Sequence, residues 1–254
     1  MTTVVQQESN NSDPTPTADF IDLFLDFAAE MATGEKTEFK LSEAQVSKNL
    51  TVDEVVAQAV IFLLAGFDTT ANALGYTSWM LATHPEILKR CQEEIDEICC
   101  EESISYEDLQ NLNYVEAVCK ETLRFFPLGA FANSRQCMKE TDVCGLTIEQ
   151  GTNVQTSKYR SITMKQLHHA VDIHSDFRWL DADRRVPPHA YIPFGAGPRI
   201  CIGMRLAMME EKIALAHLLR KFDIVNGNKV DKLKLIGTLT LTPAEVPVKI
   251  VPRK

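Results

Sequence analysis

The chain has 254 residues, of which 45% are hydrophobic, and its formal net charge at pH 7 is −9. That length allows one large or two small domains with a buried core, and the acidic balance argues against nucleic acid as a partner. The seven cysteines are an odd number without paired metal-ligand spacing, which indicates reduced thiols in a cytosol-facing protein rather than a disulfide framework.

The N-terminal region is polar. Residues 1–17 are rich in Gln, Asn, Ser, Thr and Pro, so we expect a disordered tail ahead of a single domain over residues 18–254. The first residues lack the apolar core of a signal peptide. The longest apolar run, Ala59–Phe67, is shorter than the roughly 18 residues that a membrane span needs. The sequence therefore predicts neither a leader nor a membrane anchor in this chain.

Helical patterns begin after the tail. Apolar residues recur at helical spacing over residues 20–27. Thr51-Val52-Asp53-Glu54 has the pattern of a capping box and opens a long helix. This helix is apolar on nearly every face from Val55 to Phe67, and a helix that is apolar all round is predicted to be buried.

A polar motif, Ala65-Gly66-Phe67-Asp68-Thr69-Thr70, interrupts this helix. Glycine inside a helix costs about 1 kcal/mol relative to alanine, so it usually has a packing or functional reason. A threonine hydroxyl can take the carbonyl four residues back, which bends the helix and opens a groove. Packing alone also places Gly and Thr in buried helices, so both interpretations stay open.

Three more helices are expected in the middle of the chain. A break at Thr83-His84-Pro85 precedes a charged amphipathic helix over residues 86–100, and Ser105-Tyr106-Glu107-Asp108 starts a short one. The third runs over residues 114–126 and ends before Pro127.

Within that third helix, Glu121 and Arg124 stand at i, i+3 on one face. Such a pair is usually a surface salt bridge worth under about 1 kcal/mol. Here Leu123, Phe125 and Phe126 surround it, which favours partial burial.

The C-terminal half mixes strands and one helix. Short strands are expected near residues 130–133, 143–148 and 153–155, a helix over about 202–221, and a hairpin of residues 234–241 with 246–251. Residues 156–176 lack strand alternation. Adjacent histidines in a strand point to opposite faces, which argues against a metal site at His168-His169.

A glycine-rich loop, residues 194–203, carries Cys201 directly before the last helix. Gly197 and Gly203 allow tight turns and a close approach of the backbone to a flat or bulky group. A cysteine at a helix N-terminus has its thiolate favoured by the helix dipole, and Arg199 adds positive charge. These features suit a thiolate metal ligand, while the alternative is a buried structural cysteine.

These motifs carry a family resemblance. The cysteine loop resembles the haem-binding signature of cytochromes P450, F-x-x-G-x-R-x-C-x-G, at Phe194, Gly197, Arg199, Cys201 and Gly203. Residues 65–70 resemble the oxygen-binding helix motif of that family, and Glu121-x-x-Arg124 resembles its E-x-x-R motif. The order of the motifs looks most like the animal microsomal branch. The implied fold is mostly α with small β-sheets, corresponding to the C-terminal portion of the P450 fold.

The resemblance implies a role for each matching residue. Cys201 would be the axial ligand of the iron of haem b. Gly66, Asp68 and Thr69 would hold dioxygen and deliver protons. Glu121 and Arg124 would be structural. Their third partner would be Arg178, in a segment (Asp176–Trp179) that keeps the arginine and an aromatic residue but not the family's proline and glutamate.

Two arginines are implied as haem-propionate ligands, Arg135 and Arg199, since guanidinium groups bind carboxylates in bidentate fashion. The alternative for Arg135 is a solvated surface arginine.

The implied activity is haem-thiolate monooxygenation, the insertion of one oxygen atom from dioxygen into an apolar organic substrate. Electrons would come from NADPH through NADPH–cytochrome P450 reductase. The resemblance implies the endoplasmic reticulum membrane, and the alternative for a chain without an anchor is the cytosol. The N-terminal half of the family's fold has no counterpart here, and residues 156–176 depart from its pattern, as an altered reading frame, an exon boundary or a divergent loop would explain. We therefore expect weak or absent turnover. The alternatives are a haem-binding module without turnover and a non-haem fragment that acts as an interaction protein.

Overall fold

The computed structural model describes residues 51–129, 134–156, 177–180, 190–227, 232–237 and 240–253. The chain divides into two units, residues 1–65 and 66–254. The expected tail, the helix over 20–27, the strand over 130–133 and nearly all of the segment 156–176 lie outside the described residues.

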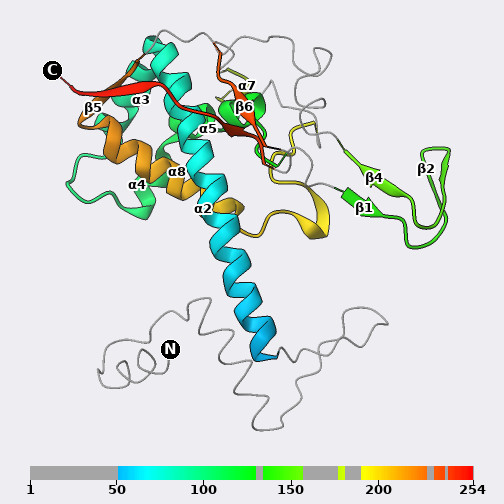
Figure 1. Cartoon of the computed structure of the whole chain (residues 1–254). Helices are drawn as coiled ribbons and strands as arrows, with labels where there is room; N and C mark the ends of the chain where they lie inside the picture. The colour runs from blue at the N-terminus through cyan, green and yellow to red at the C-terminus, as the bar shows by residue number, and fades with distance from the viewer. Residues whose placement is uncertain are drawn as a thin grey trace, which may run out of the picture. The chain divides into compact units, whose positions relative to one another are not determined.

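Helices dominate the described part of the chain. They are α2 (Val52–Thr83), α3 (Pro85–Ile98), α4 (Tyr106–Asn111), α5 (Asn113–Phe125), α7 (Phe177–Leu180) and α8 (Met204–Leu219) (Figure 1). The predicted capping box of α2 is present: the Thr51 backbone N–H donates to Glu54 Oε2 at 2.7 Å, and the Glu54 N–H donates to Thr51 Oγ1 at 3.3 Å. At the predicted start of α4, Ser105 and Asp108 form a reciprocal capping box. The predicted class, mostly α with small sheets, is confirmed.

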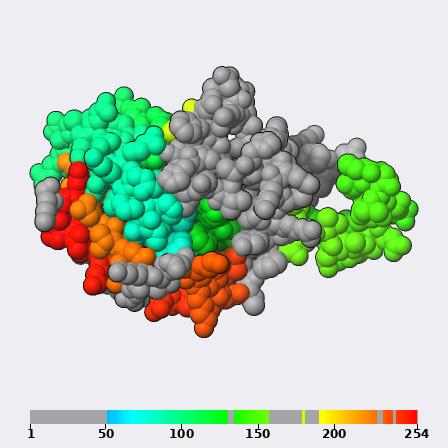
Figure 2. All heavy atoms as spheres, turned by 90° about the horizontal axis from the view of Figure 1, so that it is seen from above, coloured from blue at the N-terminus to red at the C-terminus, as the bar shows by residue number. Residues whose placement is uncertain are grey.

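The described strands form antiparallel pairs. These are β1 (Ser134–Gln136) with β4 (Asn153–Gln155), β2 (Thr141–Val143) with β3 (Leu146–Ile148), β5 (Phe222–Asn226) with β8 (Val248–Pro252), and β6 (Leu235–Ile236) with β7 (Thr242–Pro243). The pairs β1–β4 and β2–β3 form an exposed hairpin that stands apart from the helices in Figure 1 and in the space-filling view of Figure 2.

The predicted C-terminal hairpin is wrong. Residues 248–252 pair with β5 instead, in a register that sets Ile250 opposite Ile224. Ile224 is fully buried against the helices, so β5 is fixed beside the core and offers β8 a longer partner than the two-residue strand β6. Pairing between neighbouring segments of the chain was the simpler expectation, but the packing of β5 against the core favours its pairing with the more distant β8.

The main core lies among α3, α4, α5, α8, β5 and the C-terminal end of α2, which contributes Leu81 and Ala82. Apolar side chains at helical spacing on α3, including Ile87, Leu88, Cys91 and Ile95, face this core, as the amphipathic pattern predicts. A second, smaller cluster joins Ala73 and Tyr76 of α2 to Leu123 of α5 and to Leu128.

Burial along α2 differs from the prediction. Every residue from Val52 to Asp68 except Val55 is exposed, including Phe67 at 76%, whereas the buried residues run from Asn72 to Ala82. A helix that is apolar on all sides needs protein on all sides, and within the described residues only the stretch from Asn72 onward is enclosed.

The length and composition of α2 also correct the membrane prediction. An 18-residue window of this helix has a mean hydropathy of 1.4, enough to make it a candidate membrane span, and none of that window is buried. Core helices of soluble proteins pass the same test.

Candidate functional site

The cysteine loop is closed by its own backbone. The Cys201 N–H donates to the Phe194 carbonyl at 2.9 Å, and the Ile200 N–H donates to the Gly197 carbonyl at 3.0 Å. Gly195 and Gly197 have φ values of 82° and 74°, in the left-handed region that favours glycine. The loop therefore holds Cys201 immediately before the first turn of α8.

The surroundings of Cys201 are open and apolar. Cys201 is exposed, so it is not the buried structural cysteine of the alternative interpretation. Ile200, Ile202 and Leu206 are 45%, 83% and 56% exposed. Within the described residues, a Cβ added to Gly197 or to Gly203 would meet no atom within 4 Å.

Gly203 itself does not adopt the expected special turn. Its φ is −84° and its ψ is 8°, values that any residue adopts, and it caps the N-terminus of α8. Of the two signature glycines, only Gly197 is required by backbone conformation. The open space beside Gly203 is the feature that remains for a ligand to use.

Phe194 anchors the start of the loop. Its ring packs against the second core cluster, which contains Tyr76 and Leu123. Phe126 in the same cluster stacks on Tyr76, with ring centroids 4.4 Å apart. The loop is thereby attached to α2 and α5.

Glu121 and Arg124 form a buried ion pair. Arg124 Nε donates to Glu121 Oε2 at 2.9 Å and Arg124 Nη2 donates to Oε1 at 2.8 Å, with the two residues 5% and 3% exposed. The predicted burial is confirmed and is more complete than expected. Trp179 also donates, from Nε1 to Glu121 Oε2 at 3.0 Å.

Trp179 is a residue that sequence reasoning missed as a partner. The predicted third member was Arg178, whose side chain lies outside the described part of the structure. The available signal was the aromatic residue kept in the Asp176–Trp179 segment. Its indole N–H could have been considered as a donor to a buried carboxylate.

The predicted oxygen-binding residues lie on α2. Gly66 and Asp68 are exposed and Thr69 is half-buried. A Cβ on Gly66 would meet no atom of the described part of the chain within 4 Å. The buried Asn72 donates from Nδ2 to the Asp68 carbonyl at 2.8 Å, which takes up a carbonyl four residues back in the helix. Asn72 carried no sequence signal. The catalytic roles of Gly66, Asp68 and Thr69 stay predictions.

The two predicted propionate ligands are both exposed. Arg199 lies in the 3₁₀ turn Gly197–Arg199, two residues before Cys201. Arg135 lies on β1, in the exposed hairpin, and its Nη1 donates to the carbonyl of the neighbouring Ser134 at 2.8 Å. Arg199 is thus part of the cysteine loop, whereas Arg135 belongs to the hairpin, and the propionate roles of both stay predictions.

A buried polar cluster between α2, α5 and α8 had no sequence signal. Thr77 Oγ1 of α2 donates to Glu211 Oε1 of α8 at 2.6 Å, and both residues are enclosed. Burial raises the pKa of Glu211, and it raises those of Cys119 and Tyr191 well above their usual values, with the Glu211 charge adding to both. Tyr191 OH donates to the Lys120 carbonyl at 2.9 Å.

Comparisons with known proteins agree with the motifs. The sequence model of the cytochrome P450 family matches residues 1–250. The chain is 44% identical to cytochrome P450 CYP13A4 of Caenorhabditis elegans, an alignment that covers 92% of this chain and 46% of that protein. It is 46% identical to CYP13A1 of the same organism, over 93% of this chain and 47% of that protein. The chain thus spans about half the length of these curated relatives.

Proposed function

Because the chain belongs to the cytochrome P450 family, we propose that Cys201 is the axial thiolate ligand of a haem b. The observation that carries this proposal is an exposed thiol in a closed loop at the N-terminus of α8, with open space beside Gly197 and Gly203. When bound, a haem with an axial thiolate supplies the activation of dioxygen.

The residues around Cys201 fit a flat, largely apolar group with acidic edges. Ile200, Ile202 and Leu206 expose apolar surface, whose burial is worth about 25 cal/mol per Å². Arg199 offers a guanidinium to a propionate carboxylate. We propose the same role for Arg135, whose guanidinium is exposed on β1; this part of the proposal rests on the family alone.

The proposed reaction is the insertion of one oxygen atom from dioxygen into an apolar small molecule. Asp68 and Thr69 would pass protons from solvent along α2. Glu121 and Arg124 would keep α5 fixed beside the loop. Electrons from NADPH through a reductase, and residence at the endoplasmic reticulum membrane, belong to the same proposal and rest on the family alone.

Turnover by this chain is proposed to be weak or absent. Oxygen insertion requires a site that excludes water and holds the substrate in place. The thiol of Cys201, the side chain of Ile202 and the apolar residues of α2 up to Phe67 other than Val55 are exposed in this chain. We therefore propose that this chain binds haem but carries out little or no oxygen insertion.

The experiment is a reduced carbon-monoxide difference spectrum after haem reconstitution. Three proteins are compared: the unmodified chain, Cys201→Ser, and Cys100→Ser as a control at another exposed cysteine. A thiolate-type, red-shifted Soret band that disappears only in Cys201→Ser supports the proposal. A band that persists in Cys201→Ser, or no bound haem in the unmodified chain, overturns it.

A second candidate is an interaction protein that holds no haem. The observation in its favour is the apolar surface of α2, where large side chains from Val52 to Phe67 are exposed. This second candidate function predicts that the chain binds no haem. It also predicts that replacing exposed α2 residues such as Leu63 and Leu64 with Gln abolishes association with another protein.

A further inference from the structure

We propose that Trp179 is a positioning residue for the cysteine loop, acting through the Glu121 carboxylate and the Tyr191 ring. Its consequence for iron ligation rests on the proposed function of Cys201, but the positioning itself is a property of the chain without haem. Nothing in the E-x-x-R pattern requires a tryptophan at this place.

The first step is the hydrogen bonding of Glu121. A carboxylate that is 5% exposed must have its charge compensated and its oxygens bonded. Oε1 accepts from Arg124, whereas Oε2 accepts from both Arg124 and Trp179. Trp179 therefore supplies a donor from outside α5, and its indole is held at a fixed place on that helix.

The second step is the contact of the same indole with Tyr191. The ring centroids of Trp179 and Tyr191 are 4.5 Å apart at an interplanar angle of 59°, a tilted aromatic pair. Tyr191 OH donates to the Lys120 carbonyl at 2.9 Å. Two aromatic side chains in mutual contact are thus bonded to consecutive residues of α5, Lys120 and Glu121.

The third step leads from Tyr191 to Cys201. Ile192 is buried, and its carbonyl accepts from the Gly195 N–H at 3.0 Å. The Phe194 carbonyl accepts from the Cys201 N–H. An aromatic pair that fixes Tyr191 on α5 therefore fixes the residue from which the loop departs, three positions before Phe194.

The other tryptophan provides a matched control. Trp79 is also buried, at 8% exposure, and packs edge-to-face on Phe126 with ring centroids 6.0 Å apart. Within the part of the chain that the structure describes, its Nε1 has no hydrogen-bond partner. The same change, Trp to Phe, removes a bonded donor at Trp179 and an unbonded one at Trp79.

The experiment is hydrogen–deuterium exchange of backbone amides in the haem-free chain. Trp179→Phe keeps a ring beside Tyr191 but removes the donor to Glu121. A hydrogen bond to a buried charged group contributes substantially to stability. In Trp179→Phe we therefore expect the Gly195, Ile200 and Cys201 amides to exchange about tenfold faster, or more, than in the unmodified chain. Amides in the middle of α3 and α8 should keep their exchange rates, and Trp79→Phe should change neither set.

A second variant tests the other contact. Tyr191→Phe keeps the aromatic pair and removes the hydrogen bond to the Lys120 carbonyl, and it should accelerate the same loop amides. Equal acceleration of the loop and of α3 and α8 in Trp179→Phe would mean general destabilisation and overturns the proposal. Loop exchange in both variants equal to that of Trp79→Phe overturns it as well.

The haem-loaded chain gives a separate readout. If Cys201 binds iron, Trp179→Phe should show a smaller fraction of the thiolate-type Soret band than Trp79→Phe after reduction under carbon monoxide. A chain that binds no haem contradicts the proposed function, yet the exchange experiment still decides the role of Trp179. The two failures are therefore distinguishable.

Discussion

Glu211 of α8 accepts a 2.6 Å hydrogen bond from Thr77 of α2, a contact between fully enclosed side chains 134 positions apart in the sequence. Burial raises the pKa of Glu211, and the hydrogen bonds from Thr77 and Cys119 offset only part of that effect. The carboxyl group thus lies at the junction of α2, α5 and α8 in an environment that disfavours its charge.

This environment predicts a stabilising substitution. Glu211→Gln keeps the acceptor for Thr77 and removes the charge, so it should raise the free energy of unfolding at pH 7 by about 1 to 2 kcal/mol. Because the folded-state pKa lies above the usual 4.5, the folded chain binds more protons than the unfolded one, and stability falls as pH rises above 4.5. The gain should therefore shrink toward pH 4.

Urea unfolding at pH 4 and pH 7 measures this difference. Glu210→Gln is the matched control, because Glu210 is the neighbouring residue on α8 and is exposed. A Glu211→Gln chain that is less stable than the parent at pH 7 would falsify the account of a disfavoured charge.

Local structure could be predicted from the sequence more reliably than contacts between residues that are far apart in the chain. The break before Pro85, the capping box at Thr51 and the helix start at Ser105 depend on neighbouring residues, which capping rules describe. The helical register of Glu121 and Arg124 depends on residues three apart, which periodicity describes. The bonding of Trp179 to Glu121 and of Thr77 to Glu211 joins residues 58 and 134 positions apart. No local pattern carries that information.

The errors have the same origin. The sequence favoured pairing residues 234–241 with residues 246–251 because they are neighbours, whereas β8 pairs with β5, whose Ile224 is held in the core. The apolar composition of residues 55–67 predicted burial. Composition shows that a helix favours an apolar environment, but it does not show which part of the protein surrounds that helix.

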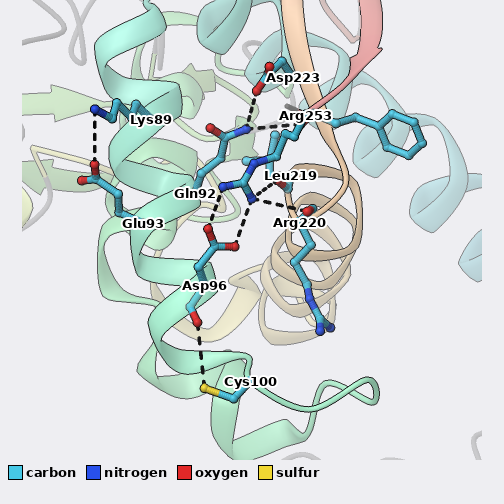
Figure 3. A network of polar contacts seen from close by, with 10 residues as sticks. Lys89, Gln92, Glu93, Asp96, Cys100, Leu219, Arg220, Asp223 and Arg253 are labelled. Carbon is cyan, nitrogen blue, oxygen red and sulfur yellow. Dashed lines mark hydrogen bonds and ion pairs between the residues drawn. The ribbon is translucent and has the colours of Figure 1, made fainter.

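The C-terminal residues should contribute measurably to stability. Arg253 Nη1 and Nη2 donate to the two oxygens of Asp96 on α3, and Nη1 also reaches the Leu219 carbonyl at 3.0 Å, as Figure 3 shows. A bidentate, partly buried ion pair with an added hydrogen bond to a carbonyl contributes more to the free energy of unfolding than an ordinary surface ion pair. Arg253→Ala should lower the free energy of unfolding by about 1 to 2 kcal/mol.

Lys89→Ala is the control for that change. Lys89 and Glu93 form an exposed i, i+4 pair on the same helix at 3.8 Å, for which we expect a loss of at most about 0.5 kcal/mol. Denaturant unfolding of both variants in low and high salt checks the ranking. Equal losses would show that Arg253 acts as an ordinary surface charge.

The start of α5 depends on a side chain from α3. Glu94 accepts from the Tyr114 and Val115 N–H groups at 2.7 and 2.9 Å, where the helix has no cap of its own from Leu112. A carboxylate at a helix N-terminus bonds orphan donors and complements the dipole. Glu94→Ala should therefore lower the free energy of unfolding by about 1 to 2 kcal/mol.

The neighbouring Glu93 is exposed and provides the matched control, Glu93→Ala. Thermal unfolding followed by circular dichroism compares the two. A Glu94→Ala chain as stable as Glu93→Ala would contradict the capping role.

The two signature glycines of the cysteine loop should respond differently to alanine. At Gly197 the φ of 74° disfavours any side chain, so Gly197→Ala should destabilise the loop by about 1 kcal/mol, with or without haem. At Gly203 the backbone is ordinary and a Cβ meets no atom within 4 Å, so Gly203→Ala should leave the haem-free chain as stable as the parent. If the open space beside Gly203 receives the haem, the added methyl must still weaken haem affinity. Thermal unfolding without haem and a haem titration separate these effects. Only the replacement of a glycine that faces the ligand lowers the haem affinity of the chain without lowering its stability. Parent-like haem affinity in a stable Gly203→Ala chain would mean that the haem lies elsewhere.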